Sequence, residues 1–338
     1  MAMEFLLNEK QKIVAYNRVS PVVLEELSDR FDVSYFTEGE YIFDPDFRNA
    51  LQEAVGIIGV DMKVSDDLLK LAPHLKVVSN VSVGYDNLDI DALTKYRVAA
   101  CHTPGVLTDT TADAIFSLLM ATARRIPELD RYVKEGQWKS VLPMEKFGTD
   151  IHHKTLGIIG MGRIGEAIAK RAYAGFDMNI MYHSRTRKIQ VEEKYEASYA
   201  SLEELLETAD FVCLITPLTL ETRNLMGPKE FKKMKASAIF INGSRGGTVD
   251  EEALVKALEA NEIRAAGLDV FQNEPISGDH PLFTLPNLVT TPHIGAATIE
   301  NEYRMASLAA KNLVDALDGK RPEGVLNPEI YDDYIKEA

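Results

Sequence analysis

Short runs of β-branched and other apolar residues alternate with helical patterns along almost the whole chain. The candidate strands of a first series are residues 13–16, 33–36, 55–60, 76–81 and 98–101, and those of a second series are residues 155–160, 178–183, 211–216, 238–242, 265–270 and 288–291. Helical patterns lie between them, at residues 22–30, 66–71, 164–172, 202–208 and 251–260. Strands that alternate with helices form parallel sheets with both faces covered. The sequence therefore predicts an α/β protein with two doubly wound parallel sheets.

The segment between the two series has a different pattern. Residues 108–125 predict a long helix, whereas residues 126–150 carry Trp138 and few strand signals, as expected of an extended arm. Another long helix is predicted at residues 298–317, and Gly319 and Pro322 end it.

Composition restricts the classes of partner. The chain has 338 residues, which suggests about two domains. Its 52 acidic and 37 basic residues give a net charge of −15, which argues against nucleic acid and anionic membranes, because both require a basic face. Cys101 and Cys213 form neither a disulfide framework nor a zinc-binding set, which fits a reducing compartment. No apolar run of 18 residues and no signal-peptide pattern occurs, so we expect a cytoplasmic protein without a membrane partner.

A glycine motif follows the first strand of the second series, in the segment Thr155-Leu-Gly-Ile-Ile-Gly160-Met-Gly162-Arg-Ile-Gly165. Glycines at this spacing allow a tight turn and a close approach of the backbone to a pyrophosphate, and the helix that follows offers its N-terminal N–H groups. A plain turn is the alternative, because the motif alone is a weak signal. In this strand–turn–helix setting it predicts dinucleotide binding by Gly160, Gly162, Arg163, Ile164 and Gly165.

The second strand of this series ends in a basic segment, Ser184-Arg185-Thr186-Arg187. An enzyme that uses NAD carries Asp or Glu at this place to bind the ribose 2′-hydroxyl. Two guanidinium groups and two hydroxyls suit a 2′-phosphate instead, which predicts a preference for NADP(H). The alternative is a solvated basic turn.

Three more segments each follow a strand, and they contain Arg245, Glu274 and His293. Strand ends at one edge of an open α/β sheet are where ligands bind. An arginine can bind a carboxylate, a histidine can exchange a proton, and a glutamate can orient and charge that histidine. From spacing alone, each of the three could equally be a surface or capping residue.

These motifs resemble those of the D-isomer-specific 2-hydroxyacid dehydrogenase family, and the resemblance covers about residues 13–328. The segments that carry it are Val81-Ser-Val-Gly84-Tyr-Asp86, the Gly160–Gly165 loop, the Arg245 segment, Glu274-Pro275 and Pro292-His293-Ile-Gly295. Residues 148–165 are similar to those of bacterial glyoxylate/hydroxypyruvate reductases that also reduce 2-ketogluconate. His102 departs from the family pattern, in which Asn is expected, and we expect this change to touch no catalytic position.

The resemblance implies a Rossmann cofactor domain inserted into a flavodoxin-like substrate domain. Residues 1–103 and 293–338 would form the substrate domain, and residues 104–292 would form the dinucleotide-binding domain. Residues 108–150 would be a dimerisation helix and arm, with Trp138 near the partner of a homodimer. An ordinary core aromatic is the alternative for Trp138.

The resemblance also implies roles for the residues of the catalytic site. Arg245 would bind the substrate carboxylate, together with the backbone N–H groups of Val83 and Gly84. His293 would donate a proton to the carbonyl oxygen as a hydride arrives from the nicotinamide. Glu274 would hydrogen-bond to His293 and favour its charged form.

Further residues would contact the cofactor. Asp269 would hold the nicotinamide carboxamide, unless it is a structural loop carboxylate. Thr216 and Pro217 would lie on the adenine side, Thr108 would approach the nicotinamide, and Gly295 would complete the cofactor site. No metal is expected, because hydride transfer with an Arg/His pair needs none.

The activity implied is reduction of a small 2-keto acid, namely glyoxylate, hydroxypyruvate or 2-ketogluconate, to the D-2-hydroxy acid. NADP(H) would be preferred and NAD(H) also accepted. A dinucleotide-sensing corepressor on the same fold is an alternative of another class, because such proteins keep the three residues; the net charge of −15 favours the enzyme. Phosphoglycerate dehydrogenase is a second enzyme alternative, which commonly carries a C-terminal regulatory extension and generally uses NAD.

Overall fold

The computed structural model describes residues 10–37 and 43–335, and these form two compact units. Unit 1 contains residues 1–107 and 298–338, and unit 2 contains residues 108–297. Unit 2 is therefore an insertion in unit 1. The boundaries expected at 103/104 and 292/293 fall a few residues earlier than those of the structure, which consequently assigns His293 to unit 2.

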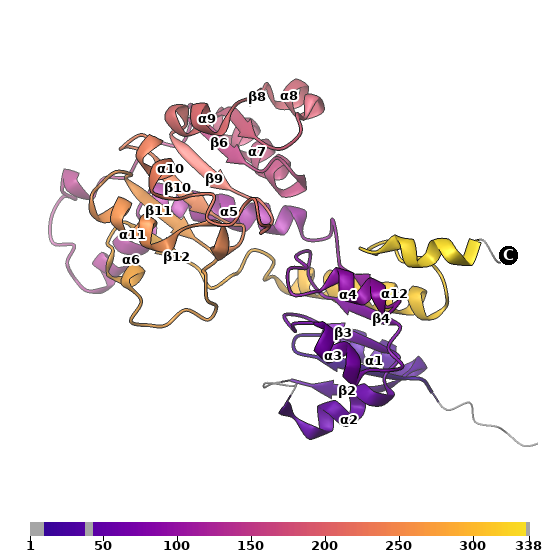
Figure 1. The fold of residues 1–338 in the computed structure, drawn as a ribbon. Coiled ribbons are helices and arrows are strands. Elements are labelled where there is room, and N and C mark those ends of the chain that lie inside the picture. Colours follow the sequence, from indigo (N-terminus) through magenta and orange to yellow (C-terminus); the bar gives the residue numbers. More distant parts are fainter. Residues whose placement is uncertain (1–9, 38–42, 336–338) are drawn as a thin grey trace, which may run out of the picture. The chain divides into compact units, whose positions relative to one another are not determined.

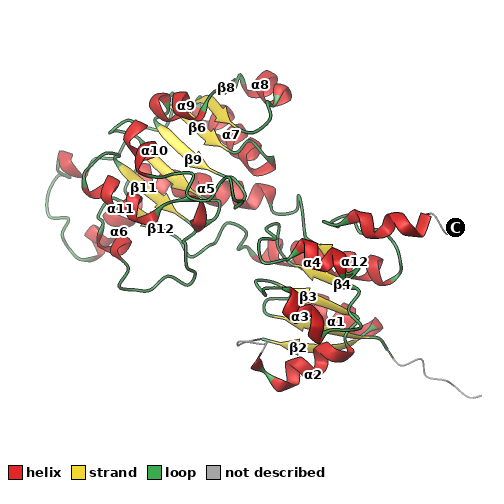
Figure 2. Ribbon diagram, in the orientation of Figure 1, coloured by secondary structure: helices red, strands yellow, loops and turns green. Residues whose placement is uncertain are grey.

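Unit 1 is built on a five-stranded sheet with the strand order β2-β1-β3-β4-β5 (Figures 1 and 2). All of its strand pairs are parallel, and the order is that of flavodoxin-like sheets. The elements are β1 (Lys12–Tyr16), α1 (Pro21–Arg30), β2 (Asp32–Phe36), α2 (Pro45–Glu53), β3 (Gly56–Gly59), α3 (Asp66–Leu71), β4 (Val77–Asn80), α4 (Ile90–Lys95), β5 (Ala99–Cys101), α12 (Ile299–Leu317) and the 3₁₀ segment Pro328–Ile335.

Both ends of the chain contribute to unit 1. Helix α12 packs against β3 and β4, and the hydroxyl of Ser79 in β4 donates to the Ala309 carbonyl of α12 at 2.7 Å. The Asn327 side chain continues the edge of the sheet: its Oδ1 accepts from Ala100 N at 2.8 Å, and its Nδ2 donates to Val98 O at 2.9 Å. Residues 298–327 thus cover one face of a sheet that residues 12–101 build.

Unit 2 contains a seven-stranded parallel sheet with the order β12-β11-β10-β9-β6-β7-β8. From β6 onward this is the Rossmann order, with one further strand at the β12 edge. The elements are α5 (Thr108–Ala123), α6 (Ile126–Lys134), β6 (Thr155–Ile159), α7 (Arg163–Phe176), β7 (Asn179–His183), α8 (Ile189–Tyr195), β8 (Ser198–Tyr199), α9 (Leu202–Thr208), β9 (Phe211–Leu214), α10 (Pro228–Lys233), β10 (Ile239–Asn242), α11 (Glu251–Glu259), β11 (Ala265–Leu268), β12 (Leu288–Thr290) and the 3₁₀ segments Met144–Lys146, Gly246–Thr248 and Pro281–Thr284.

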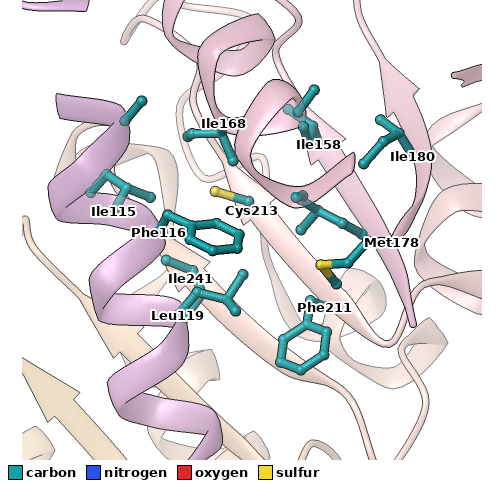
Figure 3. Packing of buried hydrophobic residues seen from close by; sticks show 14 of the residues in the cluster. Ile115, Phe116, Leu119, Ile158, Ile168, Met178, Ile180, Phe211, Cys213 and Ile241 are labelled. Carbon is teal, nitrogen blue, oxygen red and sulfur yellow. The ribbon is translucent and has the colours of Figure 1, made fainter. Parts of the chain in front are cut away.

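Alternate side chains of each strand point to opposite faces of this sheet, and helices cover both faces, so both sets of side chains are buried. Phe211 and Cys213 of β9 pack with α5 and α7, where Phe116 of α5 and Ile168 of α7 belong to the same cluster (Figure 3). Val212 and Leu214, the residues between and after them, lie in a second cluster with side chains of α9, α10 and α11. The fold confirms the prediction of two doubly wound parallel-sheet domains.

The structure also contains elements that the pattern of residues did not indicate. Helix α6 lies within the expected arm, and none of its residues is buried. The short helices α2, α4, α8 and α10 have only six to nine residues and two buried residues or fewer each, so their apolar pattern extends over too few turns to predict a helix. None of the helices in residues 10–37 and 43–335 is long and apolar enough to cross a membrane.

Candidate functional site

The glycine motif forms the turn between β6 and α7. Gly160 has a left-handed φ of 104°, and a Cβ there would overlap the Ile215 carbonyl oxygen. A Cβ at Gly165 would in turn overlap the carbonyl oxygen of Gly160. Around Gly162, however, the space that a Cβ would fill is open. Two glycines are therefore required by the turn itself, and the third leaves room for a ligand to approach the backbone.

The neighbourhood of this turn fits the diphosphate of a dinucleotide. Helix α7 begins at Arg163, and its N-cap residue Gly162 provides no side-chain cap for the N–H groups of the first turn. The Thr216 hydroxyl is buried beside Gly160 and has no hydrogen-bond partner among the described residues. A buried polar atom without a partner is costly, and a ligand in this place would satisfy it. Pro217, the next residue, is exposed.

The segment after β7 contains the four residues predicted to bind a 2′-phosphate. The Ser184 hydroxyl donates to the Thr186 carbonyl at 2.7 Å, which closes the turn. Arg187 donates through Nε and Nη2 to both carboxylate oxygens of Glu192, at 2.7–3.0 Å. Arg185 makes no such ion pair within the described chain. The two arginines of the motif are thus not equivalent.

Arg245, Glu274 and His293 follow the neighbouring strands β10, β11 and β12, at the carboxyl edge of the sheet. His293 Nδ1–H donates to Glu274 Oε2 at 2.7 Å. The second carboxylate oxygen, Oε1, accepts from the backbone N–H of Phe271 at 2.7 Å. This pair fixes the ring so that Nε2 is the nitrogen that remains for proton exchange.

The charges of the three side chains act on one another. The hydrogen bond to Glu274 raises the pKa of His293 above its ordinary value, in spite of partial burial and the charge of Arg245. Burial alone would raise the pKa of Glu274, but hydrogen bonds from His293 and Phe271 and the charges of His293 and Arg245 outweigh it and lower that pKa. The arrangement therefore holds a carboxylate beside an imidazole that favours its protonated form.

The loop that carries Arg245 packs directly against the loop that carries Glu274. A Cβ at Gly246 would overlap backbone atoms of Phe271 and Gln272, so the two main chains lie in direct contact. Gln272 N donates to Glu251 Oε1 at 2.6 Å, and its side-chain Nε2 donates to Val249 O at 2.9 Å. Glu251 and Gln272 were not singled out from the sequence, because their contact spans 21 residues and follows from no local motif.

Asp269 is buried, and its carboxylate is occupied by the loop that carries His293. It accepts from the Thr291 hydroxyl at 2.6 Å, from Ile294 N at 2.8 Å and from Gly295 N at 2.9 Å. His293 itself has a left-handed φ of 52°, which is uncommon for a residue with a side chain. These contacts correspond to the structural loop carboxylate, which the sequence analysis kept as the alternative to a contact with the nicotinamide.

Val83 and Gly84 lie in unit 1, in the turn after β4. Gly84 N donates to the Ser82 hydroxyl at 3.1 Å, and Gly84 O accepts from the buried Asn80 side chain at 2.8 Å. His102 Nδ1–H donates to the Val83 carbonyl at 2.9 Å. The ring of His102, the residue at which the sequence departs from the family pattern, thus contacts a residue that is predicted to bind the substrate. Thr108 is the first residue of α5, in unit 2.

Comparisons with known proteins show the family to which the chain belongs. A family model described as "D-isomer specific 2-hydroxyacid dehydrogenase, NAD binding domain" matches residues 116–295. The glyoxylate/hydroxypyruvate reductase B of Escherichia fergusonii is 47% identical over 321 residues, which are 95% of this chain and 99% of that protein.

Solved structures are similar over the same length. A protein from Thermus thermophilus has a TM-score of 0.86 at 40% identity, with 93% of this chain and 99% of that chain covered. The NADPH-dependent glyoxylate/hydroxypyruvate reductase of Sinorhizobium meliloti, in complex with NADP and malonate, has a TM-score of 0.84 at 30% identity, with 94% and 98% covered.

Proposed function

The chain belongs to the D-isomer-specific 2-hydroxyacid dehydrogenase family and is an oxidoreductase, and on this premise we propose that it reduces glyoxylate and hydroxypyruvate, and also 2-ketogluconate, to D-2-hydroxy acids with NADPH. Relatives that are named glyoxylate/hydroxypyruvate reductase support the assignment of glyoxylate and hydroxypyruvate as substrates. The observation that carries the chemistry is the 2.7 Å pair of His293 and Glu274, with the charge of Arg245 acting on both.

Each group has a distinct task in the proposed reaction. Bound NADPH supplies a hydride to the C2 carbon. Arg245 binds the substrate carboxylate through its planar guanidinium, and His293 donates a proton from Nε2 to the carbonyl oxygen. Glu274 keeps the imidazole charged before this transfer. Val83 remains a predicted contributor to the binding of the carboxylate through its N–H group. The N–H group of Gly84 donates to the Ser82 hydroxyl at 3.1 Å and would have to exchange this partner for the substrate.

The cofactor would be held by the turn between β6 and α7. Gly160, Gly162 and Gly165 shape this turn, and the N–H groups of Arg163 and Ile164, at the start of α7, would bind the diphosphate. Thr216 and Pro217 would lie beside it, and Thr108 and Gly295 would lie toward the nicotinamide. Asp269 would act indirectly, because its carboxylate accepts from the Thr291 hydroxyl and from the N–H groups of Ile294 and Gly295. The open space at Gly162 and the unpartnered Thr216 hydroxyl support this assignment.

A substrate panel tests the proposed activity. The protein is mixed with NADPH and glyoxylate, hydroxypyruvate or 2-ketogluconate, oxidation is followed at 340 nm, and the configuration of the product is determined. We expect turnover and the D-isomer wherever the product is chiral. If the protein binds NADPH but reduces none of the 2-keto acids, the proposed enzymatic activity is wrong, and a dinucleotide-sensing protein is favoured.

The pairing with Glu274 predicts the pH dependence of reduction. Reduction requires the protonated imidazole, so the rate falls on the alkaline side, at the raised pKa of His293. Glu274→Gln removes the charge, and its single amide oxygen can accept from only one of the two donors that Glu274 now satisfies. Both effects lower the pKa of His293, so the alkaline limb of kcat/KM should move to lower pH. Glu274→Asp keeps the charge and is the control; an unmoved limb in the glutamine variant argues against the pairing.

The cofactor preference follows from the end of β7, where no carboxylate is available for a ribose 2′-hydroxyl. A charge-assisted hydrogen bond contributes roughly 1.5–3 kcal/mol, and exposure at the edge of a site reduces it toward the lower value. With Arg187 paired to Glu192, one arginine remains to provide such a contact. We expect kcat/KM with NADPH to exceed that with NADH by about tenfold at low salt. Equal or better use of NADH would refute this preference.

A homodimer is supported by the exposed apolar side chains of α6 and the arm that follows it. Trp138 is 63% exposed, which is not what a core aromatic shows. The others are Ile126, Val133, Val141, Met144 and Phe147. Such a patch is typical of an interface. We expect light scattering to give the molar mass of a dimer for the parent protein and a lower molar mass for Trp138→Ser. A parent protein with the molar mass of a monomer would contradict the proposed homodimer. The cytoplasmic location remains a prediction.

A further inference from the structure

Arg187 is held by a carboxylate that no binding motif includes. Glu192, on α8, receives three hydrogen bonds from the guanidinium of Arg187, at 2.7–3.0 Å. The Tyr182 hydroxyl donates to the same carboxylate at 2.7 Å, and Lys188 N donates to that hydroxyl at 2.6 Å. Tyr182 belongs to β7 and Lys188 precedes α8, so this cluster spans the whole turn between the two elements.

The carboxylate at the centre of this cluster is permanently charged. The Glu192 side chain is only 14% exposed. Hydrogen bonds from Arg187 and Tyr182 lower the pKa of Glu192 to about 2. Arg187 and Glu192 therefore form a neutral pair at any pH at which the protein is assayed. Two of the guanidinium nitrogens are committed to this pair.

Arg185 is in a different situation on the same turn. Its side chain has no hydrogen bond or ion pair with residues 10–37 or 43–335, and its charge lowers the pKa of Glu221 less than the hydrogen bond from Thr219 does. The Glu221 carboxylate accepts instead from the Thr219 hydroxyl, at 2.7 Å. Arg185 thus keeps its charge and its donors for a ligand.

We propose that Glu192 is a specificity-determining residue, which withholds Arg187 from the 2′-phosphate and leaves Arg185 as the guanidinium that binds it. To turn the Nε and Nη2 edge of its guanidinium toward a phosphate, Arg187 would have to leave the mostly buried Glu192 carboxylate without its partner, beside an incoming dianion. That cost limits the preference for a 2′-phosphate to the contribution of one arginine. The inference rests on the proposed use of NADPH.

Binding of nucleotide fragments tests this inference without turnover. Calorimetry measures the affinities for adenosine 2′,5′-bisphosphate and for 5′-AMP, and their ratio reports recognition of the 2′-phosphate. Glu192→Gln should raise this ratio about tenfold, because it releases Arg187. Arg185→Ala should lower the ratio about tenfold, and Arg187→Ala should change it less than twofold.

The double variant Glu192→Gln/Arg187→Ala separates release of Arg187 from simple loss of a negative charge. Its ratio should return to within about twofold of the parent value. A double variant that keeps the gain, an unchanged ratio in Glu192→Gln, or a loss in Arg187→Ala as large as in Arg185→Ala would each overturn the proposal. An affinity for 5′-AMP within twofold of the parent shows that the adenosine site is intact in each variant.

Failure of the proposed NADPH preference has a separate signature. It would show as equal affinities of the parent protein for the two nucleotides. The comparison of Glu192→Gln with the double variant concerns Arg187 alone, so it tests Glu192 whatever the ratio of the parent is.

Discussion

Replacement of His293 by alanine is expected to lower the rate of keto-acid reduction by roughly 10²–10⁴-fold, the contribution typical of a general acid. The physical reason is the loss of the imidazole that Glu274 holds at 2.7 Å and keeps protonated. The affinity for the cofactor should be unchanged, because His293 belongs neither to the glycine turn nor to the end of β7, the two segments that are proposed to bind the cofactor. The rate of reduction under single-turnover conditions and the affinity for NADPH measure the two effects.

His152→Ala is the matched control for this variant. The His152 side chain is 60% exposed and its nearest carboxylate, Asp150, lies 4.0 Å away, so its removal should leave the rate unchanged. If the His293 variant stays within threefold of the parent while hydride transfer limits the rate, another group donates the proton.

Gly246→Ala is expected to have the largest effect on stability, and to lower the activity as well. The new methyl group would overlap the main chain of Phe271 and Gln272, and backbone atoms cannot rotate out of its way. Overpacking of a rigid contact costs about 3 kcal/mol of unfolding free energy or more. The loops of Arg245 and Glu274 would have to separate, and a displacement of about 1 Å in a catalytic group can cost roughly 10²-fold in rate.

Gly247→Ala separates this effect from a general intolerance of the loop to alanine. A Cβ at Gly247 would lie 3.2–3.3 Å from terminal carbons of Leu218, which can turn aside. This variant should therefore unfold near the parent midpoint and keep most of the activity. A Gly246 variant with the same urea midpoint and kcat/KM as the Gly247 variant would show that the two loops are not locked by their backbone contact.

The two sheets could be predicted because buried parallel strands leave a strong mark on the sequence. Strands such as β9 and β10 are buried along their whole length and read as continuous apolar runs. The glycines of the β6–α7 turn and the polar residues after β10, β11 and β12 could be found for the same reason, since they stand directly after such runs. Helix α6 was missed although Ile126, Leu129 and Val133 recur at helical spacing, because the helix has only nine residues and follows α5 after a single intervening pair of arginines.

The pairing of Arg187 lies outside what a motif can indicate. Arg185 and Arg187 are chemically identical in the sequence, and only the position of Glu192 on α8 distinguishes them. Likewise, the contact of His102 with Val83 joins residues from two different loops. Asp269 stands in a typical ligand-binding place, yet three donors of the His293 loop occupy its carboxylate. Such outcomes depend on contacts between distant segments, which local patterns do not encode.

The construction of unit 1 from both ends of the chain has a consequence for biosynthesis. Residues 12–101 leave the ribosome first, but α12 and Asn327, which cover β3 and β4 and complete the sheet edge, are made last. The roughly 190 residues of unit 2 are translated in between, which takes about 10–40 s at 5–20 residues per second. During that interval β3 and β4 lack the helix that covers one of their faces, although α1 is already present beside it. Unit 2 is therefore expected to fold first, and the N-terminal segment is expected to be the part that needs a chaperone.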